Sequence, residues 1–499
     1  MASQNPLNVY RGEDSIRDYH DPDKAPLLPL VELPYRINPY HGQGVRIYAK
    51  MMNDLPAHNV KALPALNLLR EHMRPDTRTI VEYSSGSTVI SLAILSRVLY
   101  GMTDTWAYVS NKTHLTKLRL LQFFGLKVKL FGGPSTPDPD DNRGGIRAAE
   151  MAQSHDDKIL NPNQYVSDAN WRAHILWTGP QILKQLPEVN IFCAALGTTG
   201  TMSGTGTYLK QNKPSIYCLG VCIAPGNEVP GPRMCSMIQK IDFPWRKAID
   251  CMEEITALDS FTTSIDLCRE GIICGPSSGL GYKGLINYLG KRINMHALDE
   301  LRGPDKLVHC IFLCCDLPYQ YLDEYHKILG PNYFAPMINE SLLDVDRYTY
   351  DSRWELSPQQ LLEQMGISIQ ELKLFGQPNN SAHSDSFSSM GGEIGVIDLR
   401  SASDFEACHV RGSVNVPLDS LAHSSPSPFV DANVLEQQWR ELTKKFPGSE
   451  GTTTKLNVPG RGKILIICYT GETARIATSI LRFQKIEAYS LKKGFQVLR

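Results

Sequence analysis

The strongest constraint on the fold is that short apolar runs alternate with longer helical stretches along the first 330 residues. The runs are almost continuously apolar rather than apolar at every second position, which is typical of strands buried on both faces. Such strands form parallel sheets covered by helices on both sides. The pattern therefore predicts an α/β fold with strands at residues 79–83, 105–109, 127–131, 190–195, 216–223 and 307–315.

The chain has 499 residues, which is too long for one ordinary core and predicts two or three domains. A second alternating segment starts near residue 395 and ends with a strand and a helix at 463–483. Residues 377–392 are rich in Ser, Asn and Gly without apolar periodicity, which is typical of a linker. We therefore expect an N-terminal tail (1–22), a large domain (23–330), a connecting segment with the linker (331–392) and a small domain (393–499).

The charges nearly balance, with 51 Lys and Arg against 52 Asp and Glu, which argues against nucleic acid or an anionic membrane as a partner. The sequence contains no run of eighteen apolar residues, so we expect no membrane-spanning helix. The first residues resemble neither a secretory signal nor a transit peptide, so we expect a cytoplasmic protein. The twelve cysteines fall mostly in apolar runs without a Cys-x-x-Cys pair, so we expect buried thiols and no metal site.

Four segments of the large domain place polar groups where strands join helices. Residues 57–65 put Lys61 just ahead of a helical run. Residues 82–88 offer hydroxyl and backbone N–H groups at a helix N-terminus, where a carboxylate binds well. At residues 197–201, glycines allow the backbone to approach a phosphate and threonines add hydroxyl donors. Residues 271–279 repeat the strand–turn–helix pattern with a pair of serines.

Taken together and in this order, these segments resemble the fold type II pyridoxal-phosphate family, and within it cysteine synthase and cystathionine β-synthase. Residues 59–63 match the family's lysine string, and residues 84–89 match its Thr-Ser-Gly-Asn-Thr-Gly loop. Residues 197–201 match its Gly-Thr-rich phosphate loop, residues 163–180 its Gln-Phe…Asn…Thr-Gly-Pro stretch, and residues 275–279 its Gly-Ile-Ser-Ser-Gly segment. The resemblance covers about residues 23–328. It implies two parallel-sheet subdomains, pyridoxal 5'-phosphate as cofactor, and a homodimer.

The resemblance also implies a role for each matched residue. Lys61 would form the Schiff base with the cofactor and act as acid and base at the substrate α-carbon. Ser277 would bond the pyridine nitrogen, and this neutral partner suits β-elimination. The other cofactor contacts would be Ser87, Gly197, Thr198, Thr199, Gly200 and Thr201. The substrate carboxylate would be bound by Ser84, Ser85, Gly86, Thr88 and Gln164.

Four positions depart from the family pattern. Ser87 stands in place of an asparagine that touches the cofactor's ring oxygen, and Thr199 stands in place of a glycine. Ala and Leu replace an Asp-Arg pair at 62–63, and Val89 replaces a glycine. These departures leave open a degenerate module that binds the cofactor without turnover and regulates or recruits the small domain. A serine or threonine dehydratase-like enzyme is a further alternative.

In the small domain, Cys468 follows a buried strand and opens a loop before a helix. Backbone N–H groups in such a loop are expected to lower the thiol pKa and to hold a persulfide. With residues 396–400, 404–405 and 409–417, this segment resembles a single-domain rhodanese, a sulfurtransferase. The persulfide loop would comprise Tyr469, Thr470, Gly471, Glu472 and Thr473. Asp398 and Arg400 are interpreted as a structural ion pair.

These resemblances predict β-replacement or β-elimination on an activated serine or on cysteine, coupled to sulfur transfer through a Cys468 persulfide. The choice between replacement and elimination stays open. Because the loop carries Glu472 and no basic side chain before Arg475, a protein-bound or amino-acid-derived sulfur donor fits better than thiosulfate. The expected partners are therefore an amino-acid substrate and a sulfur donor or acceptor.

Overall fold

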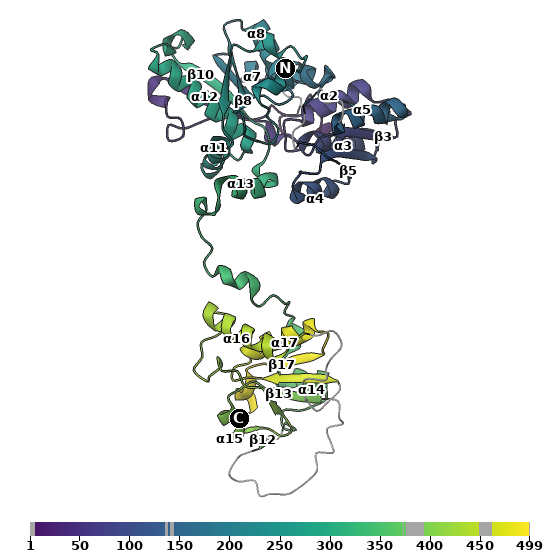
Figure 1. The fold of residues 1–499 in the computed structure, drawn as a ribbon, viewed down its shortest axis with the longest axis vertical. Coiled ribbons are helices and arrows are strands. Elements are labelled where there is room, and N and C mark those ends of the chain that lie inside the picture. The colour runs from purple at the N-terminus through teal and green to yellow at the C-terminus, as the bar shows by residue number, and fades with distance from the viewer. Residues whose placement is uncertain are drawn as a thin grey trace. The chain divides into compact units, whose positions relative to one another are not determined.

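The computed structural model of the chain describes residues 5–134, 138–139, 144–372, 374–375, 394–448 and 462–498. It divides into two compact units, Met1–Ala335 and Pro336–Arg499, each with its own sheets (Figure 1). The segment 377–392, interpreted above as a linker, lies outside the described residues. Within the described ranges, no helix combines the length and the apolar character needed to cross a membrane.

The N-terminal unit contains a six-stranded sheet in the order β1-β2-β10-β7-β8-β9. Every pair is parallel except β1 with β2 at one edge. Side chains of β10 alternate between two cores, because Ile311 and Leu313 pack on one face whereas Cys310 and Phe312 pack on the other. This confirms the predicted sheet with two covered faces. The strands are β1 (Leu30–Glu32), β2 (Val45–Met51), β7 (Ile191–Ala195), β8 (Tyr217–Ile223), β9 (Cys251–Ile255) and β10 (Val308–Cys314).

Helices cover both faces of this sheet (Figure 1). One core takes Leu66 of α2 and Leu209 of α8, and the other takes Phe261 of α11 and Leu285 of α12. One turn of π-helix, His174–Thr178, separates α6 from α7. The helices are α1 (Ser15–Tyr19), α2 (Ala62–His72), α6 (Ala169–Ala173), α7 (Gly179–Gln185), α8 (Gly200–Asn212), α9 (Cys235–Ile238), α10 (Trp245–Ala248), α11 (Ala257–Arg269), α12 (Pro276–Asn294) and α13 (Leu322–Leu329).

A second, four-stranded sheet of the same unit runs in the order β5-β4-β3-β6 and is parallel throughout. Its predicted strands are confirmed. The helix after β4 begins at Leu115 and not directly after the strand, because the hydroxyl of Ser110 accepts the Lys112 N–H and holds a turn there. The elements are β3 (Thr79–Tyr83), β4 (Thr105–Ser110), β5 (Lys127–Phe131), β6 (Ile159–Leu160), α3 (Ser87–Tyr100), α4 (Leu115–Phe123) and α5 (Gly145–His155).

The C-terminal unit contains a five-stranded parallel sheet in the order β11-β17-β16-β13-β15. Its strands are β11 (Glu355–Leu356), β13 (Ile394–Asp398), β15 (Val414–Asn415), β16 (Lys463–Ile467) and β17 (Ala488–Leu491), and a separate pair joins β12 (Leu374–Phe375) to β14 (His409–Val410). Its helices are α14 (Pro358–Met365), α15 (Ala402–Ala407), α16 (Ala432–Lys445) and α17 (Glu472–Phe483).

Part of the segment that the sequence assigned to a connection belongs to this second unit. Leu356 pairs through β11 with the edge of β17, and Leu361 of α14 lies fully buried in the core beneath it. The helix begins as its sequence predicts, with Ser357 and Gln360 forming a reciprocal capping box. The structure therefore extends the small domain upstream of residue 393.

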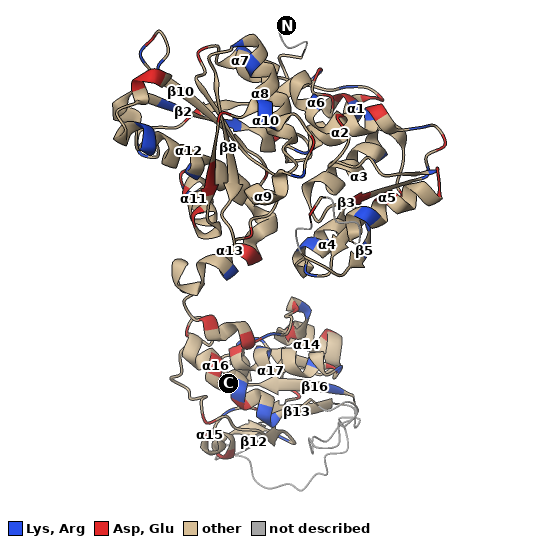
Figure 2. Ribbon diagram, turned by 45° about the horizontal axis from the view of Figure 1, so that its top comes forward, with Lys and Arg blue, Asp and Glu red and all other residues tan. Residues whose placement is uncertain are grey.

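Charges of both signs are interspersed over both units (Figure 2). The expected ion pair of the C-terminal unit is confirmed, because the Arg400 guanidinium bonds Asp398 at 2.7 Å and both side chains are buried. Arg400 also donates to the Cys408 carbonyl at 2.7 Å and lies against the ring of Phe495. Hydrogen bonds to further acceptors are what a buried ion pair needs to be tolerated, so this pair is structural.

Candidate active site

Segments that are far apart in the sequence meet where the parallel strands end. Lys61 directly precedes α2, and its neighbour Val60 donates its backbone N–H to the carbonyl of Cys315, just after β10, at 2.7 Å. Asn59 accepts a hydrogen bond from Ser91 of α3 at 3.1 Å. The lysine segment is therefore fastened both to the end of the six-stranded sheet and to the helix that follows the first strand of the four-stranded sheet.

The Lys61 amine is enclosed by protein, although its side chain keeps some accessible surface. Burial lowers the pKa of Lys61, and the positive charge of Arg233 lowers it further. The same site holds His174, whose pKa falls to about 3 because of burial and the nearby Lys61 charge. An amine with a lowered pKa has a larger neutral, nucleophilic fraction at neutral pH.

The predicted substrate loop lies between β3 and α3. Ser84, Ser85, Gly86 and Ser87 are partly exposed, whereas Thr88 is buried and donates to the amide oxygen of Gln164 at 2.8 Å. The Gln164 amide donates in turn to the Tyr83 carbonyl at 3.3 Å. The structure thus brings Gln164 to this loop across 76 residues of sequence, and the loop stands at the N-terminus of a 14-residue helix.

Asn170 connects the substrate loop with the predicted phosphate loop. Its side-chain N–H donates to the Gln164 carbonyl at 2.5 Å and to the Thr198 hydroxyl at 3.1 Å. Farther along, Thr201 of α8 contacts His174 at 3.2 Å, and His174 contacts Thr178 at 2.8 Å. The bonds of Asn170 therefore tie together loops from the two sheets.

The phosphate loop is tightly packed. A side chain at Gly197 would come within 2.6 Å of the Gly231 carbonyl, and one at Gly200 would collide with the Asn170 amide. Thr199 has φ of 63°, a left-handed conformation that is costly for a β-branched residue and natural for the glycine of the related families. The departure noted in the sequence is thus accommodated by backbone strain at Thr199.

Ser277 lies in the first turn of α12 and is buried. The Cys315 thiol donates to the Leu313 carbonyl at 3.8 Å, and burial raises the Cys315 pKa to about 12, whereas the neighbouring Ser277 and Lys61 oppose the rise. The adjacent Ser278 hydroxyl accepts the Cys315 backbone N–H at 2.9 Å. Sequence reasoning missed Cys315 because its apolar surroundings suggested an inert thiol; its place directly after a central strand was the available signal.

Two further charged residues of the site were also missed. Arg233 is buried and donates to the Tyr165 hydroxyl at 3.2 Å. Glu82 is buried, and burial raises its pKa to about 8, although the backbone N–H of Gln164 donates to it at 3.4 Å. Glu82 is therefore mostly protonated at neutral pH. A charged residue inside an apolar strand was the sequence signal for Glu82.

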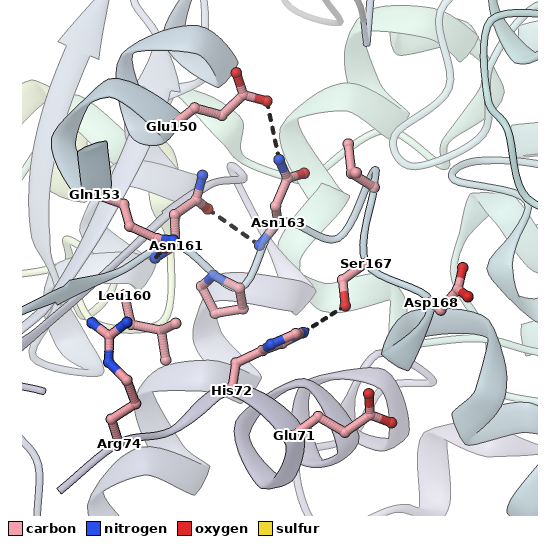
Figure 3. Close-up of a pocket in the computed structure, with 12 residues that line it drawn as sticks. Glu71, His72, Arg74, Glu150, Gln153, Leu160, Asn161, Asn163, Ser167 and Asp168 are labelled. Carbon is pink, nitrogen blue, oxygen red and sulfur yellow. Dashed lines mark hydrogen bonds between the residues drawn. The ribbon is translucent and has the colours of Figure 1, made fainter. Parts of the chain in front are cut away.

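An open hollow of about 490 Å³ is lined by the end of α2, by α5 and by residues 160–168 (Figure 3). Across it His72 bonds Ser167 at 2.7 Å, and Asn163 bonds Glu150 at 3.0 Å. Asn163 has φ of 50°, so the chain turns sharply just before Gln164. The side chains of two consecutive residues therefore point to different sites. Asn163 lines the hollow, whereas Gln164 reaches the substrate loop.

In the C-terminal unit, Cys468 follows β16 and is fully buried. Its sulfur accepts the backbone N–H of Gly471 at 3.1 Å and that of Ala474 at 3.4 Å. The expectation of a lowered thiol pKa is wrong for this structure. Burial raises the pKa of Cys468 because desolvation outweighs the N–H groups of the loop, which act in the opposite direction. The donors nonetheless surround the sulfur as expected.

The loop around Cys468 presents acidic and aromatic groups. Glu472 accepts hydrogen bonds from Ser427 at 3.0 Å and from Thr470 at 3.4 Å. Tyr469 donates to Asp404. Arg475 stacks on Tyr350 and Phe429, with its guanidinium 5.5 Å and 5.1 Å from the ring centres. Arg475, the first cationic side chain after the cysteine, is thus held by aromatic rings. Thr473 is buried and donates a hydrogen bond to Gln438.

Comparison with known proteins agrees with this geometry. A model of pyridoxal-phosphate dependent enzymes matches residues 24–300, more than half of the chain, and a model of rhodanese-like domains matches residues 385–498. A cysteine synthase of Aquifex aeolicus is 31% identical over 186 residues, which span 36% of this chain and only 54% of that protein. A putative mitochondrial cysteine synthase of Saccharomyces cerevisiae is 30% identical over 57% of this chain and 78% of its own length.

A solved structure of a hydrogen sulfide-producing enzyme from Fusobacterium nucleatum has the same fold. It is 23% identical, has a TM-score of 0.50, and covers 59% of this chain and 95% of its own. At this identity the likeness concerns the fold alone. Taken with the lysine site and its loops, the comparisons establish that the chain belongs to the family of pyridoxal-phosphate dependent enzymes of fold type II and carries a rhodanese-like domain at its C-terminus.

Proposed function

We propose that the N-terminal unit catalyses β-replacement or β-elimination on an activated serine or on cysteine, and that Cys468 carries sulfur as a persulfide. The observation that carries the proposal is that the segment of Lys61 is bonded to α3, the helix at whose start the substrate loop stands, and that this loop is tied to the phosphate loop. Thr88, Gln164, Asn170 and Thr198 form one hydrogen-bonded chain between the substrate and phosphate loops. Such a preorganised polar site is what binding an amino acid together with a phosphorylated cofactor requires.

The residues of this site fit pyridoxal phosphate. The phosphate loop ends at the N-terminus of a 13-residue helix, where backbone N–H groups favour an anion. The Asn170 side-chain oxygen is buried without a hydrogen-bond partner among the described residues and faces Gly200. We assign the phosphate to Gly197, Thr198, Thr199, Gly200 and Thr201, the ring to Ser87 and Ser277, and the covalent bond to Lys61.

When bound, pyridoxal phosphate supplies an electron sink for the pair released at the substrate α-carbon. The protein's part is to move the proton. The Lys61 amine takes the proton from the α-carbon and returns one after the β-group has left or been replaced. Burial and the Arg233 charge lower the pKa of Lys61, which keeps part of it in the neutral, basic form. His174, with a pKa near 3, stays neutral and does not compete for that proton.

The substrate carboxylate is assigned to the loop Ser84, Ser85, Gly86 and Thr88, with Gln164. The loop stands at the start of α3, where the helix dipole favours a negative charge. Thr88 and Gln164 are bonded to each other, so each holds the other in place for the ligand. From the resemblance we further propose that the enzyme acts as a homodimer, and from the polar, mixed-charge character of its first residues that it works in the cytoplasm.

In the C-terminal unit, we propose that the Cys468 thiolate attacks the outer sulfur of a donor persulfide. The donor's S–S bond breaks, Cys468 becomes the persulfide, and the donor leaves as a thiolate that takes up the proton lost by Cys468. The loop N–H groups that now contact the sulfur would hold the terminal sulfur. Glu472 and the stacked Arg475 favour a protein-bound or amino-acid-derived donor over a small anion such as thiosulfate.

Reduction with borohydride followed by peptide mass spectrometry tests the lysine assignment directly. We expect the reduced cofactor on Lys61, and loss of the label in Lys61→Arg. Lys50 is a matched control because it is also buried and burial lowers its pKa to about 7, yet it bonds Leu28, Gln181 and Gln185 away from the site. A label on Lys50, or an unlabelled protein after incubation with pyridoxal phosphate, would overturn the assignment.

Turnover separates the remaining possibilities. Cysteine formed from O-acetylserine and sulfide indicates replacement, whereas sulfide released from cysteine indicates elimination. Ammonia and a keto acid from serine alone would favour the dehydratase, and Lys61→Ala with full biological activity would favour the degenerate module. For Cys468, we expect one extra sulfur atom on its peptide after exposure to cysteine persulfide. Cys408, a half-buried thiol of the same unit, is the control.

A further inference from the structure

Arg233 stands at the carboxyl edge of the six-stranded sheet. Its backbone N–H donates to the Leu196 carbonyl, just after β7, at 2.8 Å, and its carbonyl accepts the N–H of Ile223, the last residue of β8, at 3.1 Å. The segment of Arg233 also packs on the phosphate loop, because a side chain at Gly197 would come within 2.6 Å of the Gly231 carbonyl. Ligands of parallel sheets bind at this edge. The backbone of Arg233 is therefore fixed beside the proposed cofactor site.

The Arg233 side chain reaches from this edge to the segment that follows the four-stranded sheet. It is only 4% exposed, and its guanidinium donates to the Tyr165 hydroxyl at 3.2 Å and lies 5.1 Å from the centre of that ring. Tyr165 directly follows Gln164, whose amide oxygen accepts from Thr88 of the substrate loop. The guanidinium thus lies between the phosphate-loop side and the substrate-loop side of the site. Its positive charge contributes to the lowered pKa of Lys61, in agreement with this position.

The chemistry of a guanidinium indicates what it would bind. It is a planar fork of five N–H donors, and the bond to Tyr165 uses one of them. Such a fork fits two oxygens of a phosphate, sulfate or carboxylate group. The N-termini of α8 and α3 are already assigned to the cofactor phosphate and the substrate carboxylate. A further anion in this site has to belong to the remaining part of the substrate, which is the group at its β-carbon.

We propose that Arg233 is a specificity-determining residue that selects an oxyanion at the β-position of the substrate, carried either by the group that leaves or by the nucleophile that replaces it. This inference rests on the proposed function and names its substrate class. When an oxyanion leaves, the bond between the β-carbon and its oxygen breaks, the electron pair departs with that oxygen, and Lys61 takes the α-proton. Arg233 binds the negative charge that develops on the departing group.

The test compares Arg233→Gln with the native full-length protein on two pairs of substrates. One pair is O-phosphoserine and O-acetylserine with sulfide as nucleophile, and the other is thiosulfate and sulfide with O-acetylserine as donor. In one of the pairs, kcat/KM for the oxyanion-bearing member should fall about tenfold to a hundredfold more than for the other member, because a charge-assisted hydrogen bond is lost. A selective loss in the first pair assigns the oxyanion to the leaving group, and one in the second pair assigns it to the nucleophile.

Two further variants make the comparison specific. Arg246→Gln is the matched control, because Arg246 also lies over an aromatic ring of the same unit, but it is exposed and bonds the Ile241 carbonyl. It should leave the ratio of kcat/KM within each pair unchanged. Tyr165→Phe removes the hydroxyl that holds the guanidinium, and should lower the same ratio as Arg233→Gln by about threefold. If Arg233→Gln does not fold, an unchanged ratio in Tyr165→Phe overturns the inference.

The outcomes separate this inference from the proposed function. Equal losses for both members of each pair in Arg233→Gln would mean that Arg233 acts only on Lys61, and would overturn the selective role while the proposed function stands. A native protein that accepts neither O-phosphoserine nor thiosulfate would also overturn the inference. The proposed function fails with it only if borohydride reduction leaves Lys61 unlabelled as well.

Discussion

Replacing Glu82 by Gln should remove a large pH dependence of stability. Burial raises the pKa of Glu82 to about 8 from its ordinary value of 4.5. The folded protein therefore holds this proton over a pH range in which the unfolded chain has lost it. Stability falls as pH rises through that range, and the full cost is reached only above the folded pKa. This difference in pKa corresponds to a cost of about 5 kcal/mol in the free energy of unfolding.

The assay is equilibrium urea unfolding of the full chain at several pH values from about 5 to about 9. The transition of the N-terminal unit is the one that moves to higher urea when pyridoxal phosphate is added. We expect Glu82→Gln to gain stability over the native protein progressively as pH rises, by about 1.4 kcal/mol for each pH unit in mid-range. Gln keeps an oxygen to accept the Gln164 N–H, so the hydrogen bond is preserved.

Glu188→Gln, which changes an exposed carboxyl of the same unit, is the control and should show no comparable trend. A stability difference between the native protein and Glu82→Gln that stays constant across the pH range would refute the reasoning. It would mean that Glu82 is ionised in the folded state, so that solvation or an opposite charge compensates for its burial.

Three further substitutions have definite expected outcomes. Thr199→Gly should raise the free energy of unfolding of the N-terminal unit by about 0.5–1 kcal/mol in the same urea assay. Glycine adopts the left-handed conformation without strain, but the greater entropy of glycine in the unfolded chain offsets part of the stabilisation. Gly200→Ala should weaken pyridoxal phosphate binding at least about tenfold in a titration, because the new methyl group collides with Asn170. Asp398→Asn should destabilise the C-terminal unit by about 3–5 kcal/mol in thermal unfolding, because it leaves Arg400 buried without its counter-charge; an unchanged melting temperature would contradict this.

Most of the strands that could be predicted from the sequence are buried on both faces, although the edge strand β5 was predicted with mostly exposed side chains. Every residue of β10 is buried, and its run is apolar apart from His309. The strands that escaped prediction include β1, β6 and β11, which are two or three residues long. Such short segments become strands because they pair with a neighbouring strand, and their own sequence carries no strand pattern. The antiparallel edge pair β1–β2 also escaped prediction, although β2 is seven residues long.

The candidate site divides in a similar way. A few consecutive residues are enough to indicate the chemistry of Lys61, of the glycine turns and of Cys468. Cys315 and Glu82 do not, because their environment comes from segments distant in the sequence. The pKa of Cys468 shows most clearly what cannot be predicted from a local sequence pattern. Counting the N–H donors of its loop predicts a thiolate, but the balance is decided by burial, which depends on the whole packed unit.

The pairing of β11 with β17 determines where the C-terminal unit can be cut. Similarity to rhodanese-like domains begins at residue 385, yet Leu356 and Leu361 upstream of that point are wholly enclosed by this unit. A chain beginning at residue 385 would leave one side of β17 open to pairing with other chains, and would bare the apolar surface beneath α14. A truncation near residue 336, by contrast, keeps that edge covered. The C-terminal unit that can be expressed alone is therefore longer than the segment that is similar to rhodanese-like domains. The additional upstream residues protect the unit against aggregation.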